Sequence, residues 1–413
     1  MRILFVVPYV PNLVRVRSYQ LIRHLTARGH QVTVLTLWSN GQERADATAL
    51  AQQCEQVIAL HLPRWRSWWN SLRALPTAVP LQATYAWQPE LAGKLRQLTQ
   101  VVNGKHLFDL IHVEHLRGVG YGLYYRQNSS RQNGLPLIWD SVDSISHLFR
   151  QTAVHGDSLS SRWLARLELE RTERYEGWLT SQFDQTLVTS PTDKTALEKL
   201  SPGASPPIHV LPNGVDLSYF WPSSGTAREA ASLVISGKMS YHANISMVLY
   251  LLEAIMPHVW ARRPETQVTI VGKDPPRRLR AAAQNPQVTV TGEVADIRPY
   301  LRRAAVAVAP ILYGAGIQNK VLEAMACATP VVATPLAISA LKIVPGQEAL
   351  VAEQPAAIAE AILSLLASPE QRYQVGAAGR RYVEQNHQWS AVAGCLESIY
   401  QEAVCTHQHR EQS

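Results

Sequence analysis

The chain has few cysteines and no long uninterrupted run of apolar residues. Its 413 residues include four cysteines, none in a CxxC pair or at metal-ligand spacing, which suits a reducing cytosol better than secretion. The longest apolar candidate, Ile245–Trp260, contains Glu253 and Pro257, so we expect no membrane-spanning segment. The opening MRILFVVPYV is broken too early by Pro8 and Pro11 to act as a signal peptide. We interpret it as a first strand.

Glycine is absent from the loop after that strand. A dinucleotide-binding βαβ unit carries GxGxxG at this point, whereas this loop reads PYVPNLVRVRS and leads into a predicted helix, Tyr19–Arg28. The loop therefore argues against NAD or FAD. Arg15 and Arg17 in the loop could hold a phosphate group of a ligand, although solvated loop arginines are the commoner case.

Acidic residues are scarce in the first third of the chain. Residues 1–131 hold 15 Lys and Arg against 6 Asp and Glu, while the whole chain has a formal net charge of +7. A positive excess confined to one part of a protein suggests a surface that meets something anionic. Nucleic acid, a membrane and a phosphorylated substrate all fit this charge.

Apolar strand-like runs alternate with helical patterns along most of the chain, which predicts α/β architecture with parallel sheets. The Pro-, Gly- and Ser-rich segment SPGASPPIH (201–209) is the best domain boundary. We therefore expect two domains, residues 1–203 and 204–388. We also expect residues 389–405 to form a C-terminal helix and residues 406–413 to be a disordered tail.

One stretch, Val306–Pro335, organises the second domain. It reads as a buried strand, a glycine turn with Gly314 and Gly316, a helix from about Asn319, and a second strand. Ligands of open α/β sheets bind at such turns, and the start of a helix favours an anion. Lys320 adds a cation at that point. A phosphate-bearing ligand and an ordinary βα turn remain equal alternatives from the pattern alone.

The motif GIQNKVLEAMA in this stretch, followed by PVVATP, resembles the nucleotide-sugar site of family-4 glycosyltransferases. It is most similar to an exopolysaccharide-associated subgroup, and the resemblance covers nearly the whole chain. It implies the GT-B fold, two Rossmann-like domains with parallel sheets facing across a cleft. The first domain would bind the acceptor, and the second the nucleotide sugar. The C-terminal helix would cross back onto the first domain.

The resemblance also implies donor-binding residues in the second domain. These are Gly237, Lys238, Glu293, Gly314, Gly316, Ile317, Gln318, Asn319, Lys320 and Glu323. Relatives carry a second cation about five residues after the first, where this chain has Ala243 and Asn244. Lys320 is the expected replacement. The first acid of the family's Glu-x7-Glu motif is replaced by Ala315, and Glu323 is the second acid.

In the first domain, the resemblance points to the end of the predicted strand FDLIHVEH. The cleft histidine of the family corresponds to Glu114, and His115 follows one residue later. Either residue could have the catalytic role, and the choice stays open here. Asp140 and Asp143, near the carboxyl end of the next predicted strand, could bind acceptor hydroxyls, although aspartates are equally common in turns and caps. Arg15 and Arg17 could hold an acceptor phosphate.

The segment LPRWRSWWNSLRALP is an unusual surface element. Trp65, Trp68 and Trp69 fall on one face of a short helix flanked by arginines, a composition typical of interfacial anchors. Packing onto the domain, or a wall of an acceptor pocket, is the alternative. The segment suggests an anionic membrane surface as a partner and a cytoplasmic location, peripheral at the inner face of the plasma membrane.

The resemblance predicts a retaining glycosyltransferase that moves a sugar from a nucleotide diphosphate to a sugar or lipid-linked acceptor, in exopolysaccharide or cell-surface glycan synthesis. Nucleic acid is not an expected partner. No metal or other cofactor is expected, because no Asp-x-Asp site is evident and lysines can neutralise the diphosphate. The alternative is a non-catalytic GT-B binding or assembly protein, favoured by the missing acid and the missing second cation. A GT-B epimerase or phosphorylase is a third, smaller alternative.

Overall fold

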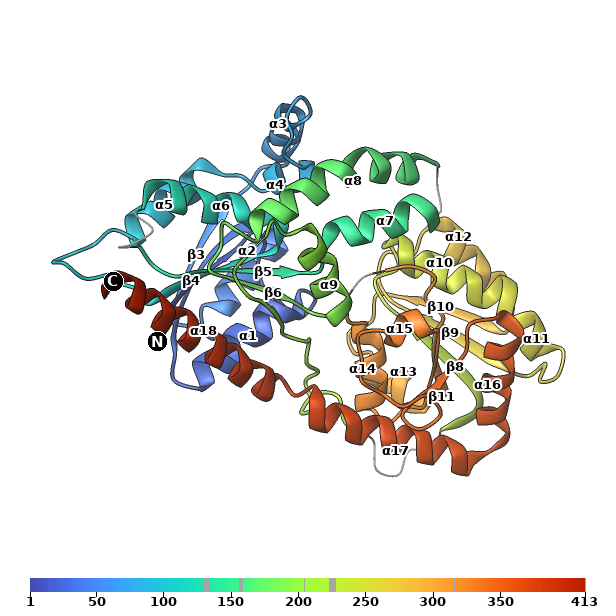
Figure 1. The fold of residues 1–413 in the computed structure, drawn as a ribbon. Coiled ribbons are helices and arrows are strands. Elements are labelled where there is room, and N and C mark those ends of the chain that lie inside the picture. Colours follow the sequence, from blue (N-terminus) through green and yellow to red (C-terminus); the bar gives the residue numbers. More distant parts are fainter. Residues whose placement is uncertain (130–133, 156–158, 204, 223–227, 315, 413) are drawn as a thin grey trace. The chain divides into compact units, whose positions relative to one another are not determined.

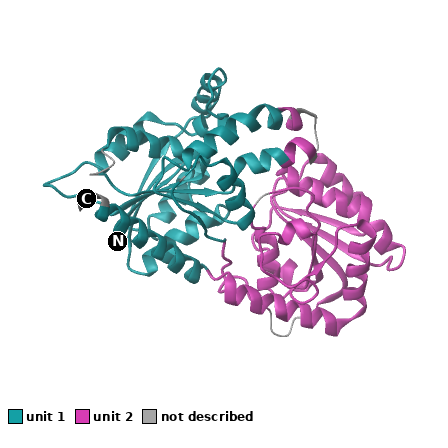
Figure 2. Ribbon diagram, viewed as in Figure 1, with its two compact units in different colours: residues 1–150, 164–212, 389–413 teal, residues 151–163, 213–388 magenta. Residues whose placement is uncertain are grey.

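The computed structural model describes residues 1–129, 134–155, 159–203, 205–222, 228–314 and 316–412. Contacts divide the chain into two compact units (Figure 2). Unit 1 comprises residues 1–150, 164–212 and 389–413, and unit 2 comprises residues 151–163 and 213–388. Each unit contains one parallel sheet with helices on both faces, so the predicted pair of Rossmann-like domains is confirmed.

Unit 1 has a seven-stranded sheet in the order β3-β2-β1-β4-β5-β6-β7 (Figure 1). Its strands are β1 (Arg2–Val7), β2 (Gln31–Trp38), β3 (Gln56–His61), β4 (Leu110–Glu114), β5 (Leu137–Val142), β6 (Gln185–Val188) and β7 (Ile208–Val210). Its helices are α1 (Val16–Ala27), α2 (Gly41–Leu50), α3 (Arg64–Ala74), α4 (Leu81–Tyr85), α5 (Pro89–Leu98), α6 (His115–Asn128), α9 (Pro191–Leu200) and α18 (Trp389–Gln412). The contact division passes through α7 (Ile145–His155) and α8 (Leu159–Leu179).

The central strands of unit 1 are apolar on both faces, because each face has its own core. Leu4 and Val6 of β1 pack into a cluster with α5 and α6. Ile3 and Phe5 face the opposite way, into a cluster with α1 and α18. This alternation follows from the two-residue period of a strand and explains why the sequence shows a continuous apolar run there.

Unit 2 has a six-stranded sheet in the order β10-β9-β8-β11-β12-β13. Its strands are β8 (Glu229–Ser236), β9 (Gln267–Val271), β10 (Val288–Gly292), β11 (Ala304–Ala309), β12 (Val331–Ala333) and β13 (Leu350–Val351). The helices are α10 (His242–Tyr250), α11 (Met256–Trp260), α12 (Arg277–Ala281), α13 (Arg298–Arg303), α14 (Asn319–Ala326), α15 (Pro335–Ile338), α16 (Pro355–Ala367) and α17 (Pro369–Asn386). A π-helical segment, η1 (Leu251–Ile255), joins α10 to α11, and a short 3₁₀ turn, η2 (Ala282–Gln284), follows α12.

Two features at the ends of unit 1 differ from the sequence prediction. The contact division falls between Pro212 and Asn213 rather than at 203/204, because β7 pairs in parallel with β6 and extends the first sheet. Residues 406–412 continue α18 instead of forming a disordered tail, and His407 is buried. Helix α18 packs against α1 with its apolar face, which includes Trp389.

Within the described part of the chain, no helix combines the length and apolar character needed to cross a bilayer.

Candidate functional site

The two predicted donor turns of unit 2 follow neighbouring strands of its sheet. Gly237 and Lys238 come directly after β8, and the glycine turn follows β11. Gly314 has a φ of 155° and Gly316 a φ of 68°, conformations that favour glycine. Because parallel strands end at the same edge of the sheet, both turns lie at that edge, where open α/β sheets bind ligands.

Helix α14 brings two opposite charges to this edge. It begins at Asn319, as predicted, and places Lys320 and Glu323 one turn apart. Both side chains are only partly exposed. Burial lowers the pKa of Lys320 to about 8, and the nearby Glu323 carboxylate opposes that shift. Burial raises the pKa of Glu323 to about 7, and Lys320 opposes it. An anionic ligand would stabilise the charged lysine.

The remaining donor candidates have different surroundings. The Nζ atom of Lys320 donates to Gln318 Oε1 at 3.0 Å, and Asn319 Oδ1 accepts from Asn213 Nδ2 at 3.2 Å. Ile317 is buried in the core of unit 2. Lys238 and Glu293 are exposed. Glu293 follows β10, which is separated from β8 by β9. Ala315 lies outside the described residues.

In unit 1, Glu114 ends β4 and is enclosed by protein. Its Oε1 atom accepts a hydrogen bond from the Tyr9 hydroxyl at 2.6 Å, and the residue is 2% exposed. Burial, reinforced by the Asp140 charge, raises the pKa of Glu114 to about 7. Glu114 therefore ties the loop after β1 to the end of β4, a contact that the sequence did not predict.

His115 begins α6 and keeps some exposed surface. Its φ of 63° is rare for a non-glycine residue, and Val142 at the end of the adjacent β5 has a φ of 68°. The backbone N–H of Arg117 donates to His115 Nδ1 at 3.2 Å, so the ring proton of a neutral His115 lies on Nε2. Burial, with a smaller contribution from Arg117, lowers the pKa of His115 to about 3. At neutral pH this ring is a hydrogen-bond donor through Nε2.

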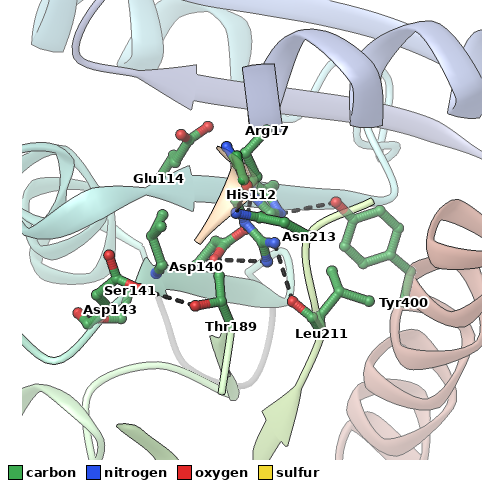
Figure 3. A network of polar contacts seen from close by, with 12 residues as sticks. Arg17, His112, Glu114, Asp140, Ser141, Asp143, Thr189, Leu211, Asn213 and Tyr400 are labelled. Carbon is green, nitrogen blue, oxygen red and sulfur yellow. Dashed lines mark hydrogen bonds and ion pairs between the residues drawn. The ribbon is translucent and has the colours of Figure 1, made fainter. Parts of the chain in front are cut away.

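Two of the predicted acceptor-binding residues bind each other (Figure 3). Arg17 lies in α1 rather than in a loop, and its Nε and Nη2 atoms donate to Asp140 at 2.8 and 3.2 Å. The Arg17 side chain is 6% exposed and that of Asp140 is fully buried. His112 Nε2 lies 3.7 Å from Asp140, and its Nδ1 atom lies 2.8 Å from the Tyr400 hydroxyl of α18. These contacts give Arg17 and Asp140 a structural role, and acceptor binding by them stays a prediction.

The other two acceptor candidates also have protein partners. Arg15 pairs with Glu43 at 2.9 Å and lies over the Tyr9 ring. Asp143 Oδ1 accepts from the Thr189 hydroxyl at 2.9 Å. Burial, reinforced by Asp193, raises the pKa of Asp143 to about 7. Their contact with an acceptor likewise stays a prediction.

No cluster of three or more His, Cys, Asp or Glu side chains suited to a metal ion occurs in the described ranges. The metal-independent chemistry expected from the sequence stays a prediction.

Two family models match the two halves of the chain. One, described as "Glycosyl transferase 4-like domain", matches residues 14–214, and the other, "Glycosyl transferases group 1", matches residues 230–368. Together with the paired sheets, these matches define a glycosyltransferase of the GT-B class. The chain belongs to the GT-B glycosyltransferases that combine a glycosyl transferase 4-like domain with a following domain of the glycosyl transferases group 1 family.

Curated relatives match about half of the chain. An MMP α-(1→4)-mannosyltransferase of Mycolicibacterium hassiacum is 28% identical over 205 residues, covering 48% of this chain and 49% of the relative. A phosphatidyl-myo-inositol mannosyltransferase of Mycobacterium tuberculosis is 29% identical over 204 residues, covering 46% and 53%. The chain thus spans about half the length of the curated relatives it matches.

Solved structures share the fold over nearly the whole chain. Sucrose-phosphate synthase from Thermosynechococcus elongatus superimposes with a TM-score of 0.71 at 19% identity, covering 98% of this chain and 100% of the other. Anabaena Alr3699/HepE, solved in complex with UDP-glucose, gives a TM-score of 0.65 at 14% identity, covering 97% and 100%. At these identities the likeness concerns the fold alone.

Proposed function

We propose that this protein transfers a sugar from a nucleotide diphosphate sugar to a glycan or lipid-linked acceptor. The observation that carries the proposal is the recessed pair of Lys320 and Glu323 at the start of α14, directly after the glycine turn. The shifted pKa values indicate that burial penalises both charges. Such a pair is typical of a site that awaits a charged, hydroxylated ligand. A diphosphate would meet Lys320, and sugar or ribose hydroxyls would donate to Glu323.

The chemistry follows from the charge that develops on the leaving group. Departure of the nucleotide diphosphate leaves an oxocarbenium-like sugar, and cations with oriented N–H groups stabilise the leaving phosphates. Lys320, Lys238 and the helix start at Asn319 would supply these without a metal. We further propose retention of configuration by same-face attack, in which the leaving phosphate accepts the acceptor proton. A role in exopolysaccharide or cell-surface glycan synthesis is part of the same proposal.

The names and ligands of similar proteins also support the proposal. The names of the two curated relatives described above are those of mannosyltransferases, one of them a phosphatidyl-myo-inositol mannosyltransferase. The Anabaena protein was solved with UDP-glucose as its ligand. These facts favour a nucleotide sugar as donor and leave open which base and which sugar this chain takes.

A panel of UDP-, GDP-, ADP- and dTDP-sugars tests the proposal. At a hundredfold excess over its dissociation constant, the correct donor should raise the thermal unfolding midpoint by about 5–10 °C. The same donor should be turned over, with release of the nucleoside diphosphate when an acceptor glycan or lipid is added. Stabilisation without turnover across a broad set of acceptors would favour the binding or assembly protein. The absence of stabilisation by every donor would contradict the proposed donor site.

We propose in addition that α3 contacts an anionic membrane surface. Trp65, Trp68 and Trp69 are 62%, 78% and 49% exposed, and Leu72 is 56% exposed. Figure 1 shows α3 standing out from the helices around it. The opposite face of α3 packs against the rest of unit 1, where the Asn70 side chain donates to the Trp87 carbonyl at 2.8 Å.

The charge around these tryptophans supports the same surface. Arg66 lies over the Trp65 ring and Arg73 over the Trp69 ring, at 5.1 and 5.3 Å from the ring centroids. Tryptophan beside arginine is typical of membrane-interface helices. Each basic residue near an anionic surface adds about 1 kcal/mol of attraction, which salt screens. This surface would keep the enzyme peripheral at the inner leaflet, near a lipid-linked acceptor.

Vesicle sedimentation tests the α3 surface. The wild type should bind vesicles that contain anionic phosphatidylglycerol more strongly than neutral ones, and salt should weaken the binding. A Trp65/Trp68/Trp69→Ser triple variant should lose most of it. Trp221→Ser is the control, because Trp221 of unit 2 is 42% exposed and lies under Arg302. Equal sedimentation of the triple variant and the wild type would refute this surface.

A further inference from the structure

The turn that carries Lys238 is held tightly at its backbone. The Gly237 N–H donates to the Val271 carbonyl at 3.1 Å, and the Met239 N–H donates to the Lys273 carbonyl at 3.0 Å. Gly237 has a φ of 153°, and a Cβ atom there would lie 2.7 Å from Asn244 Nδ2. The turn is therefore packed between the end of β9 and the first turn of α10.

Asn244 makes the decisive contact with this turn. It is 7% exposed, and its Nδ2 atom donates to the Lys238 carbonyl at 2.9 Å. The Tyr241 N–H donates to the same carbonyl at 3.1 Å. Two donors thus fix the Lys238 peptide, while the Lys238 side chain is exposed. The sequence resemblance predicted a second cation at about this position, whereas the Asn244 amide binds backbone.

The N-terminal part of α10 also reaches the glycine turn. His242 Nδ1 lies 2.9 Å from the Tyr313 hydroxyl, and the two rings are nearly parallel, at 9° with centroids 5.4 Å apart. Ser246 Oγ lies 3.2 Å from the same hydroxyl. Tyr313 is 1% exposed and directly precedes Gly314. Through Tyr313, α10 fixes the chain just before the segment that leads to Lys320.

We propose that the N-terminal part of α10 is the positioning element of the donor site: Asn244 holds the Lys238 turn, and His242 with Ser246 holds the glycine turn through Tyr313. The inference rests on the proposed function, because it assigns a purpose to fixing these two turns together. A diphosphate that binds both lysines needs their attachment points at a constant separation. Loops that must order on binding weaken affinity, whereas turns fixed to one helix do not.

A double-mutant cycle tests the Asn244 contact. The probe is whichever of UDP, GDP, ADP and dTDP stabilises the wild type. Asn244→Ala should raise the dissociation constant of that nucleoside diphosphate by about tenfold. If Asn244 acts through Lys238, it should have no further effect in a Lys238→Ala background. Asn386→Ala is the matched control, since it removes a hydrogen bond of 2.9 Å that the Asn386 side-chain amide donates to the Tyr382 carbonyl in the same unit. The control should leave nucleotide affinity unchanged.

A second cycle tests the Tyr313 contact. Tyr313→Phe and His242→Ala should each raise the same dissociation constant by about tenfold, and the double variant should be no worse than either single variant. His242→Gln, which keeps a polar side chain beside Tyr313, should restore part of the affinity. In a Lys238→Ala background, Tyr313→Phe should raise the dissociation constant by the same factor as in the wild type, because Tyr313 holds the glycine turn and not the Lys238 turn. Tyr250→Phe is the control, since that hydroxyl donates to the Glu353 carbonyl from the last residue of α10.

The outcomes separate this inference from the proposed function. A wild type that binds none of UDP, GDP, ADP and dTDP, and none of their sugar derivatives, would refute the proposed donor site itself. A wild type that binds, with Asn244→Ala and Tyr313→Phe binding equally well, would refute the positioning role alone. Weaker binding that is fully additive between Asn244→Ala and Lys238→Ala would also refute it. Thermal unfolding of each variant shows whether a loss reflects unfolding, and the two cycles are read at a temperature where every variant is folded.

Discussion

Replacing Lys320 with alanine should raise the dissociation constant of the nucleotide by at least about tenfold, since a hydrogen bond to a charged group contributes about 1.5–3 kcal/mol. Lys320 is the cation at the start of α14, and its side chain is only partly exposed. Isothermal titration with the nucleotide that stabilises the wild type measures the effect. Lys342→Ala, a change at an exposed lysine of the same unit, should leave affinity unchanged.

The pH dependence of binding distinguishes a diphosphate contact from a packing effect. Below a pKa of about 8, free Lys320 carries its proton and attracts the diphosphate. Above it, binding must also take up a proton, so the dissociation constant should rise with pH. Lys320→Arg keeps the charge throughout this range and should remove the rise. Unchanged affinity in Lys320→Ala, or a rise that persists in Lys320→Arg, would contradict the assignment.

The donor half of the site was predictable because its signals are local. Gly314, Gly316 and the helical periodicity after Asn319 lie within one short stretch, and each follows from a residue's own conformational preference. The parallel pairing of strands in each sheet follows from the alternation of strand and helix along the chain. No partner distant in the sequence was needed to place Lys320 and Glu323 one turn apart on α14.

The contacts that hold the site were not predictable, because they join residues far apart in sequence. Tyr400 and His112 are separated by 288 positions, and Tyr9 and Glu114 by 105. Neither tyrosine belongs to a motif, and a hydroxyl partner is not visible in composition. In the sequence, Asn244 marks only the absence of a lysine, whereas the structure gives its amide a definite partner.

The predicted start of α1 and the predicted end of α18 were wrong for a related reason. Arg17 was predicted in a loop because prolines precede it, but α1 begins at Val16 and buries Arg17 against Asp140. Burying an arginine requires a paired carboxylate, which the sequence places 123 residues away. Similarly, the tail after residue 405 has a polar composition, yet α18 continues through it, and His407 is buried.

Kinetics should distinguish Glu114 from His115, the two candidates for the catalytic residue of unit 1. We expect His115→Ala to lower turnover by about a hundredfold and to leave donor affinity nearly unchanged, because His115 presents Nε2–H at the end of β4. This ring is neutral at pH 7, since burial lowers its pKa to about 3. Protonation of His115 should therefore produce no step near pH 6.5 in the turnover of the wild type.

Glu114 should behave as a residue that positions the loop after β1. Glu114→Gln keeps an oxygen that can accept from the Tyr9 hydroxyl, which lies 2.6 Å from the carboxylate, so turnover should fall by less than about threefold. Glu114→Ala and Tyr9→Phe both remove that bond, and we expect each to raise the KM for the acceptor with a smaller change in kcat. Steady-state kinetics with the donor and acceptor varied in turn separates these effects. A loss of turnover in Glu114→Gln as large as in His115→Ala would assign the catalytic role to Glu114. Normal turnover in both alanine variants would show that neither residue at the end of β4 has that role.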